Sequence, residues 1–174
     1  MRSECRIWPV DAAIITVSDS CHAGSRKDIS GPLAARTLEE AGFTIRISVT
    51  VPDDAPAIAA AIRSAAAAVR LVVTTGGTGI AARDVTPEAT GMVCERILDG
   101  FGELMRAEGR KSTEFAALSR AGAGTLGTSL IVNVPGSPKG AVESLRVVLP
   151  LVPHALALLA GDTAHDDSSS EMSV

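Results

Sequence analysis

The residues best suited to bind a phosphate lie in the segment 71–90, LVVTTGGTGIAARDVTPEAT. Residues 71–75 are apolar or β-branched and predict a buried strand. The glycine-rich run 76–79 follows, and glycines let a backbone turn sharply and bring its amides against a ligand. Residues 86–87, Thr-Pro, then predict the N-cap and first position of a helix. A glycine turn between strand and helix suits a phosphate, because free amides and the helix dipole face the anion.

One carboxylate, Asp84, lies five residues after this glycine run. A carboxylate beside a phosphate is unfavourable unless a cation lies between them, so the spacing indicates a nucleotide with a divalent metal. The alternatives are a tight loop without a ligand, and an Asp84 that only stabilises the following helix through its dipole. The spacing matches neither the P-loop nor the dinucleotide fingerprint. The residues alone therefore predict a phosphate-binding turn of unassigned class.

The rest of the chain alternates predicted strands with predicted helices, which favours a three-layer α/β/α domain with a mostly parallel sheet. We expect strands at 12–17, 44–51, 71–75 and 130–134, separated by a polar loop at 18–30 and a turn at 52–54. We expect helices at 33–41, 55–68, 87–98, 101–108 and 138–149, and a last one ending near residue 159. The segment 110–117 fits either a polar connection or a helix.

Polar and turn-forming residues follow four of these strands. They are Ser18 and Asp19, Asp53, the run 76–79, and the segment 135–137. Because ligands of parallel sheets bind at the carboxyl ends of the strands, we expect these segments to form one crevice. The alternative for Asp53 is a simple turn residue, while Asp54 is expected to cap the helix at 55–68.

A second anion site is expected where the strand at 130–134 ends. Ser137 is a good N-cap and Pro138 a good first helical residue, so the amides near them should point outward. Lys139 either reaches a phosphate as a point charge or is a solvated helix lysine. The candidate binding residues are Ser18, Asp19, Thr75, Gly76, Gly77, Thr78, Gly79, Ser119, Arg120, Pro135, Gly136, Ser137 and Lys139.

Composition limits the function classes. The chain has 174 residues, a net charge of −4 and 2% aromatic residues, so nucleic acid is an unlikely partner. We expect one domain at 12–161, a loose lead-in at 1–11 and a disordered tail at 162–174. No apolar run approaches membrane-spanning length, and no signal peptide is expected. The cysteines, Cys5, Cys21 and Cys94, fit no zinc or redox motif, which favours a cytoplasmic protein.

The motifs together resemble the molybdopterin adenylyltransferase family, which includes bacterial molybdenum cofactor proteins and the G domain of gephyrin-like proteins. TGGTG followed by RDVTPEAT is the most specific match. Further matches follow in the family's order at 17–20 with 28–32, at 52–54, and at 118–120 with 133–139. The resemblance covers roughly 12–161 and implies the molybdopterin-binding variant of the α/β/α fold.

The resemblance also implies a reaction, in which molybdopterin and Mg-ATP give adenylyl-molybdopterin and pyrophosphate. It assigns catalysis and Mg²⁺ binding to Asp53 and Asp84. Ser119 and Arg120 would hold the pterin's phosphate or amide edge. Family members form trimers, some form hexamers, and a downstream molybdotransferase uses the product. The alternatives are a non-catalytic pterin-binding or scaffold protein, or another branch of the fold, against which the full RDVTPEAT match argues.

Overall fold

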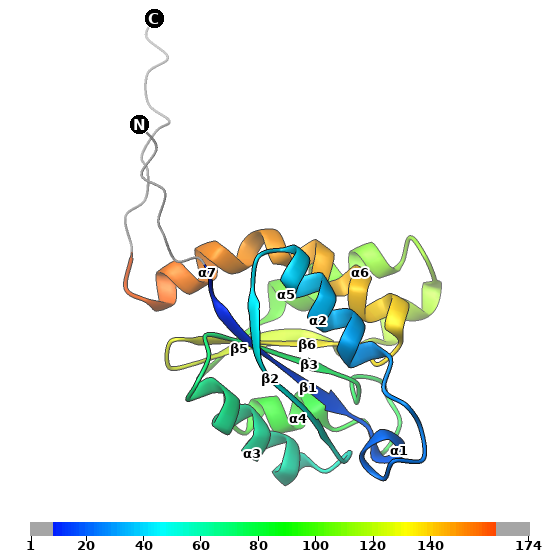
Figure 1. Ribbon diagram of the computed structural model, residues 1–174. Coiled ribbons are helices and arrows are strands. Elements are labelled where there is room, and N and C mark those ends of the chain that lie inside the picture. The colour runs from blue at the N-terminus through cyan, green and yellow to red at the C-terminus, as the bar shows by residue number, and fades with distance from the viewer. Residues whose placement is uncertain (1–8, 163–174) are drawn as a thin grey trace, which may run out of the picture.

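The computed structural model describes residues 9–162, so most of the expected lead-in and tail, with Cys5, lies outside the described residues. Figure 1 shows a central sheet with helices on both faces. The strands are β1 (Asp11–Val17), β2 (Thr44–Val51), β3 (Leu71–Thr75), β4 (Arg96–Leu98), β5 (Gly122–Leu126) and β6 (Ser129–Val134). The helices are α1 (Asp19–His22), α2 (Ser30–Glu40), α3 (Ala55–Ala66), α4 (Thr86–Gly91), α5 (Asp99–Gly109), α6 (Pro138–Val148) and α7 (Val152–Leu159), with 3₁₀ helices η1 (Glu114–Leu118) and η2 (Leu149–Leu151).

The sheet has six strands in the order β2-β1-β3-β6-β5-β4. The first four are mutually parallel, whereas β5 and β4 run antiparallel to their neighbours. In the centre, Ile14 of β1 pairs with Val73 of β3, which pairs in turn with Val132 of β6. The predicted mostly parallel α/β/α fold is confirmed, and the carboxyl ends of four strands lie along one edge.

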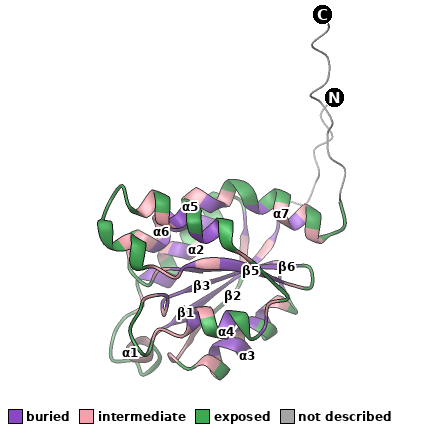
Figure 2. Cartoon of the chain, turned by 180° about the vertical axis from the view of Figure 1, so that it is seen from behind, coloured by how far each residue is buried: buried purple, intermediate pink, exposed green. Residues whose placement is uncertain are grey.

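Alternate residues of the central strands supply two separate cores. Ile14, Val73 and Val132 pack on one face against side chains of α2, α5, α6 and α7. Ile15, Val72 and Ile131 pack on the other face against α3 and α4. Figure 2 shows these strands as buried, with the exposed residues on the outer sides of the helices. Burial on both faces explains why these strands read as continuous apolar runs in the sequence.

The predicted helix at 87–98 is wrong in its second half. Helix α4 ends at Gly91, and residues 96–98 form the edge strand β4. Ile97 pairs with Gly124 of β5, so a tertiary pairing overrides the local helical pattern there. Helix α5 begins at Asp99, two residues before the predicted start of the helix at 101–108.

Strand β5 was not predicted, because its sequence GAGTL carries little β-propensity. Gly124 of this strand is nonetheless required, since a Cβ there would lie 2.7 Å from Cys94 Sγ. The expected loop at 18–30 contains the short helix α1, and α2 begins at Ser30, three residues earlier than predicted. The segment 110–117, which fitted either a connection or a helix, contains a short connection and most of the 3₁₀ helix η1.

The expected helix caps have mixed outcomes. Asp54 caps α3 as predicted, since its Oδ2 accepts a hydrogen bond from Ala57 N at 3.0 Å. Ser137 caps α6 by accepting from Gly140 N at 3.2 Å. Thr86 is not an N-cap, because Val85 holds that position and Thr86 is the first helical residue. Its hydroxyl turns back to the glycine loop, which is described below.

One helical stretch among the described residues, 138–159, is long and apolar enough to cross a membrane by length and composition alone. It consists of α6, η2 and α7, joined at an interruption that contains Pro150. Leu145, Val148, Val152 and Leu156 of this stretch are buried in the core of one sheet face. Its apolar character is therefore used in packing against the sheet.

A buried polar network joins β3, β6 and α4. Asn133 Oδ1 accepts hydrogen bonds from Thr74 Oγ1 at 2.9 Å and Thr90 Oγ1 at 3.1 Å. Its Nδ2 lies 2.8 Å from Thr90 Oγ1. All three residues are buried, so each depends on the others for its hydrogen bonds.

Replacing Asn133 by Ala is expected to lower the free energy of unfolding by about 2–4 kcal/mol, because two buried hydroxyls lose their partner. Urea denaturation at equilibrium measures this loss. Ser48→Ala is the matched control, since Ser48 is exposed on β2. If the two variants unfold at the same urea concentration, the network does not stabilise the fold.

Candidate functional site

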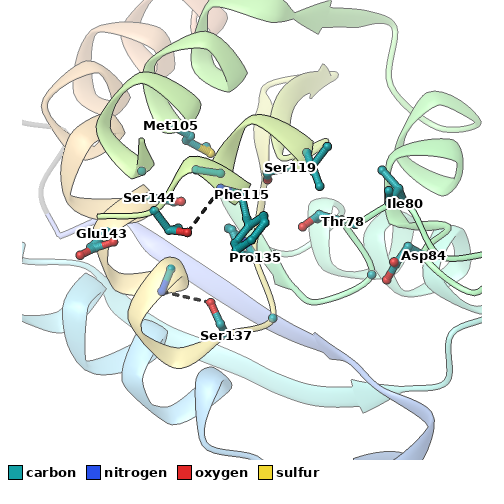
Figure 3. A pocket seen from close by; sticks show the side chains of 18 residues that line it. Thr78, Ile80, Asp84, Met105, Phe115, Ser119, Pro135, Ser137, Glu143 and Ser144 are labelled. Carbon is teal, nitrogen blue, oxygen red and sulfur yellow. Dashed lines mark hydrogen bonds between the residues drawn. The ribbon is translucent and has the colours of Figure 1, made fainter. Parts of the chain in front are cut away.

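Two cavities open at the carboxyl edge of the parallel strands, and Gly77, Gly136 and Ser137 line both of them. Cavity A has a volume of about 430 Å³ and is shown in Figure 3. Its other lining residues are Thr78, Gly79, Ile80, Asp84, Met105, Gly109, Thr113, Phe115, Ala116, Leu118, Ser119, Pro135, Gly140, Glu143 and Ser144. Cavity B has a volume of about 510 Å³, and its other lining residues are Thr16, Val17, Ser18, Cys21, Arg26, Lys27, Asp28, Ile29, Ser30, Asp53, Thr75, Gly76 and Pro138.

The rim between the cavities consists of two backbone turns, one at Gly76 and Gly77 and the other at Gly136 and Ser137. The two turns pack directly against each other. Gly76 has a φ of +105°, and a Cβ there would lie 2.2 Å from the carbonyl oxygen of Val17. A Cβ on Gly136 would lie 3.1 Å from the Cα of Gly76. Side chains larger than hydrogen would separate the turns, so these glycines set the close approach of β1, β3 and β6 at their ends.

Threonine hydroxyls fix these turns from within. Thr86 Oγ1 donates to the carbonyl oxygen of Gly76 at 2.8 Å, and Thr75 Oγ1 donates to that of Pro135 at 2.9 Å. Both threonines are buried. We predicted Thr75 as a binding residue; its hydroxyl proton is used by the protein, and a direct ligand contact stays a prediction. The amides of the glycine turns remain the better candidates for an anion.

Arg120 anchors the loop that follows β3. Its backbone N donates to the carbonyl oxygen of Thr78 at 2.8 Å, and its Nε donates to that of Gly79 at 2.7 Å. The remaining guanidinium nitrogens bind the Asp84 carbonyl oxygen and the carboxylate of Glu88. The hydrogen bond from Arg120 holds the pKa of Glu88 below its ordinary value. The predicted pterin contact of Arg120 stays a prediction, whereas its contact with the loop is evident.

The two predicted catalytic carboxylates lie at this edge but line different cavities. Asp84 lines cavity A, and its Oδ2 accepts from Ala81 N at 2.9 Å. Asp53 lines cavity B, and its Oδ2 accepts from Asp19 N at 2.8 Å, while Asp53 N donates to Asp19 Oδ1 at 3.0 Å. Asp19 also forms an ion pair with Arg83, which connects the end of β1 to the loop carrying Asp84.

The other predicted binding residues differ in whether they line a cavity. Ser18 caps α1 and lines cavity B, and Thr78 and Ser119 line cavity A. Lys139 lines neither cavity; its Nζ lies 3.7 Å from Glu143 Oε1. The expectation of a solvated lysine on α6 therefore describes this side chain better than the expectation of a phosphate ligand.

Sequence reasoning missed several lining residues. Glu143 lines cavity A from α6, one helical turn after Lys139, and no signal in the sequence distinguishes it from other helix carboxylates. Figure 3 shows Glu143 and Asp84 at opposite ends of cavity A. Phe115 and Ile80, both 69% exposed, are further apolar residues that line cavity A.

The donor set for a metal is sparse. Within residues 9–162 no group of three or more His, Cys, Asp or Glu side chains could hold an ion. Asp53 and Asp84 each have one carboxylate oxygen without a hydrogen bond to another described residue. Mg²⁺ commonly binds one or two carboxylates and completes its shell with phosphate and water, so these residues fit an ion that arrives with a nucleotide.

Burial raises the pKa of Cys94 to about 11, so this thiol stays protonated at neutral pH.

The chain was compared with known proteins. The profile of the family described as "probable molybdopterin binding domain" matches residues 13–154. A molybdopterin adenylyltransferase of Haemophilus influenzae is 35% identical over 85% of this chain and 83% of its own length. A molybdenum cofactor biosynthesis bifunctional protein of Synechococcus elongatus is 40% identical over 87% of this chain, which spans only 48% of that relative. The crystal structure of the molybdopterin biosynthesis enzyme MoaB of Thermus thermophilus is 45% identical over 87% of this chain and 97% of its own, with a TM-score of 0.82.

Replacing Arg120 by Ala is expected to raise the pKa of Glu88 toward its ordinary value, because the hydrogen bond that stabilises the ionised carboxylate is lost. The pKa of Glu88 is lower in the folded than in the unfolded state, so the pairing stabilises the fold at pH values above the unfolded-state pKa. This stabilisation is lost as the pH falls through the folded-state pKa. NMR titration of the Glu88 side-chain carbon measures the shift. Arg36→Ala, an exposed substitution on α2, serves as the control, and an unchanged Glu88 titration in Arg120→Ala would contradict this account.

Proposed function

The chain belongs to the family of molybdopterin-binding domains of molybdenum cofactor biosynthesis, and we propose that it adenylylates molybdopterin with Mg-ATP and releases pyrophosphate. The observation that carries this proposal is the pair of cavities that share one rim of glycine turns, with a candidate carboxylate in each. Two phosphorylated substrates need two adjoining sites whose phosphates meet at one point. The name of the Haemophilus influenzae relative supports the same activity.

Catalysis at the shared rim would consist of positioning and charge neutralisation. The amides around Gly77, Gly136 and Ser137 can hold the phosphates of both substrates, because Ser137 and Pro138 begin helix α6. A phosphate monoester is already ionised at neutral pH and needs no general base. Asp53 and Asp84 would hold Mg²⁺, which supplies neutralisation of the charge that develops on phosphorus.

Cavity A fits the pterin ring better than the adenine ring. Phe115, Ile80 and buried Met105 offer apolar surface to a flat heterocycle. The pterin pyrimidine edge presents adjacent N–H donors, which a carboxylate accepts, whereas the adenine edge alternates a donor with an acceptor. Glu143 Oε1 accepts from Ser112 Oγ at 3.0 Å, and its second oxygen has no hydrogen bond to another described residue. That oxygen is available to the pterin edge.

The proposal includes the setting of the reaction. We expect a cytoplasmic homotrimer or hexamer whose product passes to a separate molybdotransferase. A non-catalytic pterin-binding or scaffold protein is the alternative, and the presence of both Asp53 and Asp84 at the rim favours the enzyme. Pyrophosphate release from ATP that depends on added molybdopterin distinguishes the two.

Asp53→Ala and Asp84→Ala are each expected to lower adenylyl transfer by at least about 100-fold while molybdopterin still binds, because charge neutralisation is lost at the rim. Molybdopterin-dependent pyrophosphate release is the assay. Asp54→Ala is the adjacent control, since Asp54 caps α3 and lines neither cavity. Near wild-type turnover in either of the first two variants would refute its assigned role.

Glu143→Ala is expected to raise the KM for molybdopterin about 10- to 100-fold with little change in the KM for ATP, because a charge-assisted hydrogen bond to the pterin edge is lost. Steady-state kinetics with each substrate varied in turn separates the two constants. Glu103→Ala, an exposed substitution on α5, controls for the loss of a surface carboxylate. A parallel rise in both constants would argue against a pterin contact.

A further inference from the structure

Two adjacent cationic side chains, Arg26 and Lys27, line cavity B without a protein partner. Within the part of the chain that the structure describes, neither side chain makes an ion pair or a hydrogen bond. Other cations near the site are paired, as Arg83 is with Asp19 and Arg120 with Glu88. The loop that carries Arg26 and Lys27 therefore brings two cationic groups without an ion-pair partner to the edge of cavity B.

The two carboxylates of the same cavity, Asp28 and Asp53, form no ion pair with these cations and accept hydrogen bonds from neutral groups instead. Asp28 accepts from Thr16 Oγ1 at 2.6 Å and from Gly31 N at 3.0 Å. Asp53 accepts from the backbone N of Asp19 at 2.8 Å. Asp28 and one oxygen of Asp53 are thus held by neutral donors, while both cationic groups of cavity B have no partner among the described residues.

The backbone adds positive potential at the same place. Two 11-residue helices begin at cavity B, α2 at Ser30 and α6 at Pro138, and both residues line it. The N-terminus of α2 already has an anionic partner, because Gly31 N donates to Asp28 Oδ1, whereas α6 has no acidic residue in its first turn. Together with the cationic pair, the N-terminus of α6 favours a ligand with several negative charges close together. A polyphosphate is the part of the proposed substrates that has this chemistry.

We propose that Arg26 and Lys27 bind the β- and γ-phosphates of ATP in cavity B and stabilise the departing pyrophosphate; this inference rests on the proposed function. In the transfer, an oxygen of the molybdopterin phosphate bonds to the α-phosphorus, and the bond from that phosphorus to the α–β bridging oxygen breaks. The bridging oxygen and its electron pair leave with pyrophosphate. Charge accumulates on the group that the two cations contact, so they act on leaving-group departure as well as on binding.

The double variant Arg26→Ala/Lys27→Ala tests the proposal by calorimetric titration with ATP and with AMP. We expect the Kd for ATP to rise about 10- to 100-fold and the Kd for AMP to change less than about twofold, because AMP lacks the phosphates that the cations contact. The rise should be larger at low salt, since exposed charges are screened by ions. A double variant that binds ATP as wild type does, or that loses ATP and AMP equally, overturns the proposal.

Two control proteins separate local contact from general charge and from loop structure. Arg36→Ala/Arg146→Ala removes two exposed cations from α2 and α6 outside both cavities and should leave the Kd for ATP unchanged. Arg26→Lys/Lys27→Arg keeps both charges and should bind ATP within about fivefold of wild type. If the charge-removing control weakens ATP binding as much as the test variant, the effect belongs to net charge and the proposal fails.

The same titrations keep this inference distinct from the proposed function, because ATP binding is measured without molybdopterin. Selective loss of ATP affinity in a protein that never releases pyrophosphate would support the role of Arg26 and Lys27 and reject the transferase. Full transfer activity with an unchanged KM for ATP in the double variant would support the transferase and reject the role of the two cations. A wild-type protein that fails to bind ATP at millimolar concentration rejects both.

Discussion

The site depends on how closely three backbone segments approach one another where β1, β3 and β6 end. Gly76 packs against the carbonyl oxygen of Val17, where a Cβ would lie only 2.2 Å away, and Gly136 packs against Gly76, where a Cβ would be crowded at 3.1 Å. This contact brings the three strand ends together at the rim that the two cavities share. Every other element of the site either supports this contact or lines the space beside it.

Charged side chains divide into those that hold the loops and those that face the cavities. One group binds loop backbone or pairs within itself and so holds the loops in place; it consists of Arg120, Glu88 and the Asp19–Arg83 pair. Glu143, Arg26 and Lys27 line the cavities and retain unused hydrogen-bonding capacity. Sequence motifs do not show this division, since a motif marks both kinds of residue equally, and the predicted ligand contacts of Asp19 and Arg120 stay predictions.

Much of the fold could be predicted from the sequence, because the central strands β1, β3 and β6 are short apolar runs followed by turn-forming residues. Residues 71–75 were located without error, as was the edge strand at 44–51 from its alternating pattern, and the N-cap role of Ser137 followed from the Ser-Pro pair. The failures lie where partners distant in sequence decide the structure: β4 exists only because β5 pairs with it, and β5 itself is too rich in glycine to be recognised. The site residues missed by sequence reasoning, Glu143 and the 26–27 pair, lie in unremarkable surroundings, and only the folded chain shows which side of a helix or loop adjoins a cavity.

Arg70 holds both described ends of the domain together at the edge opposite the cavities. Its backbone N donates to the carbonyl oxygen of Asp11, where β1 begins, and its guanidinium binds the carbonyl oxygen of Leu156 near the end of α7. A covalent fusion at either end would therefore emerge on the side away from the mouth of the site.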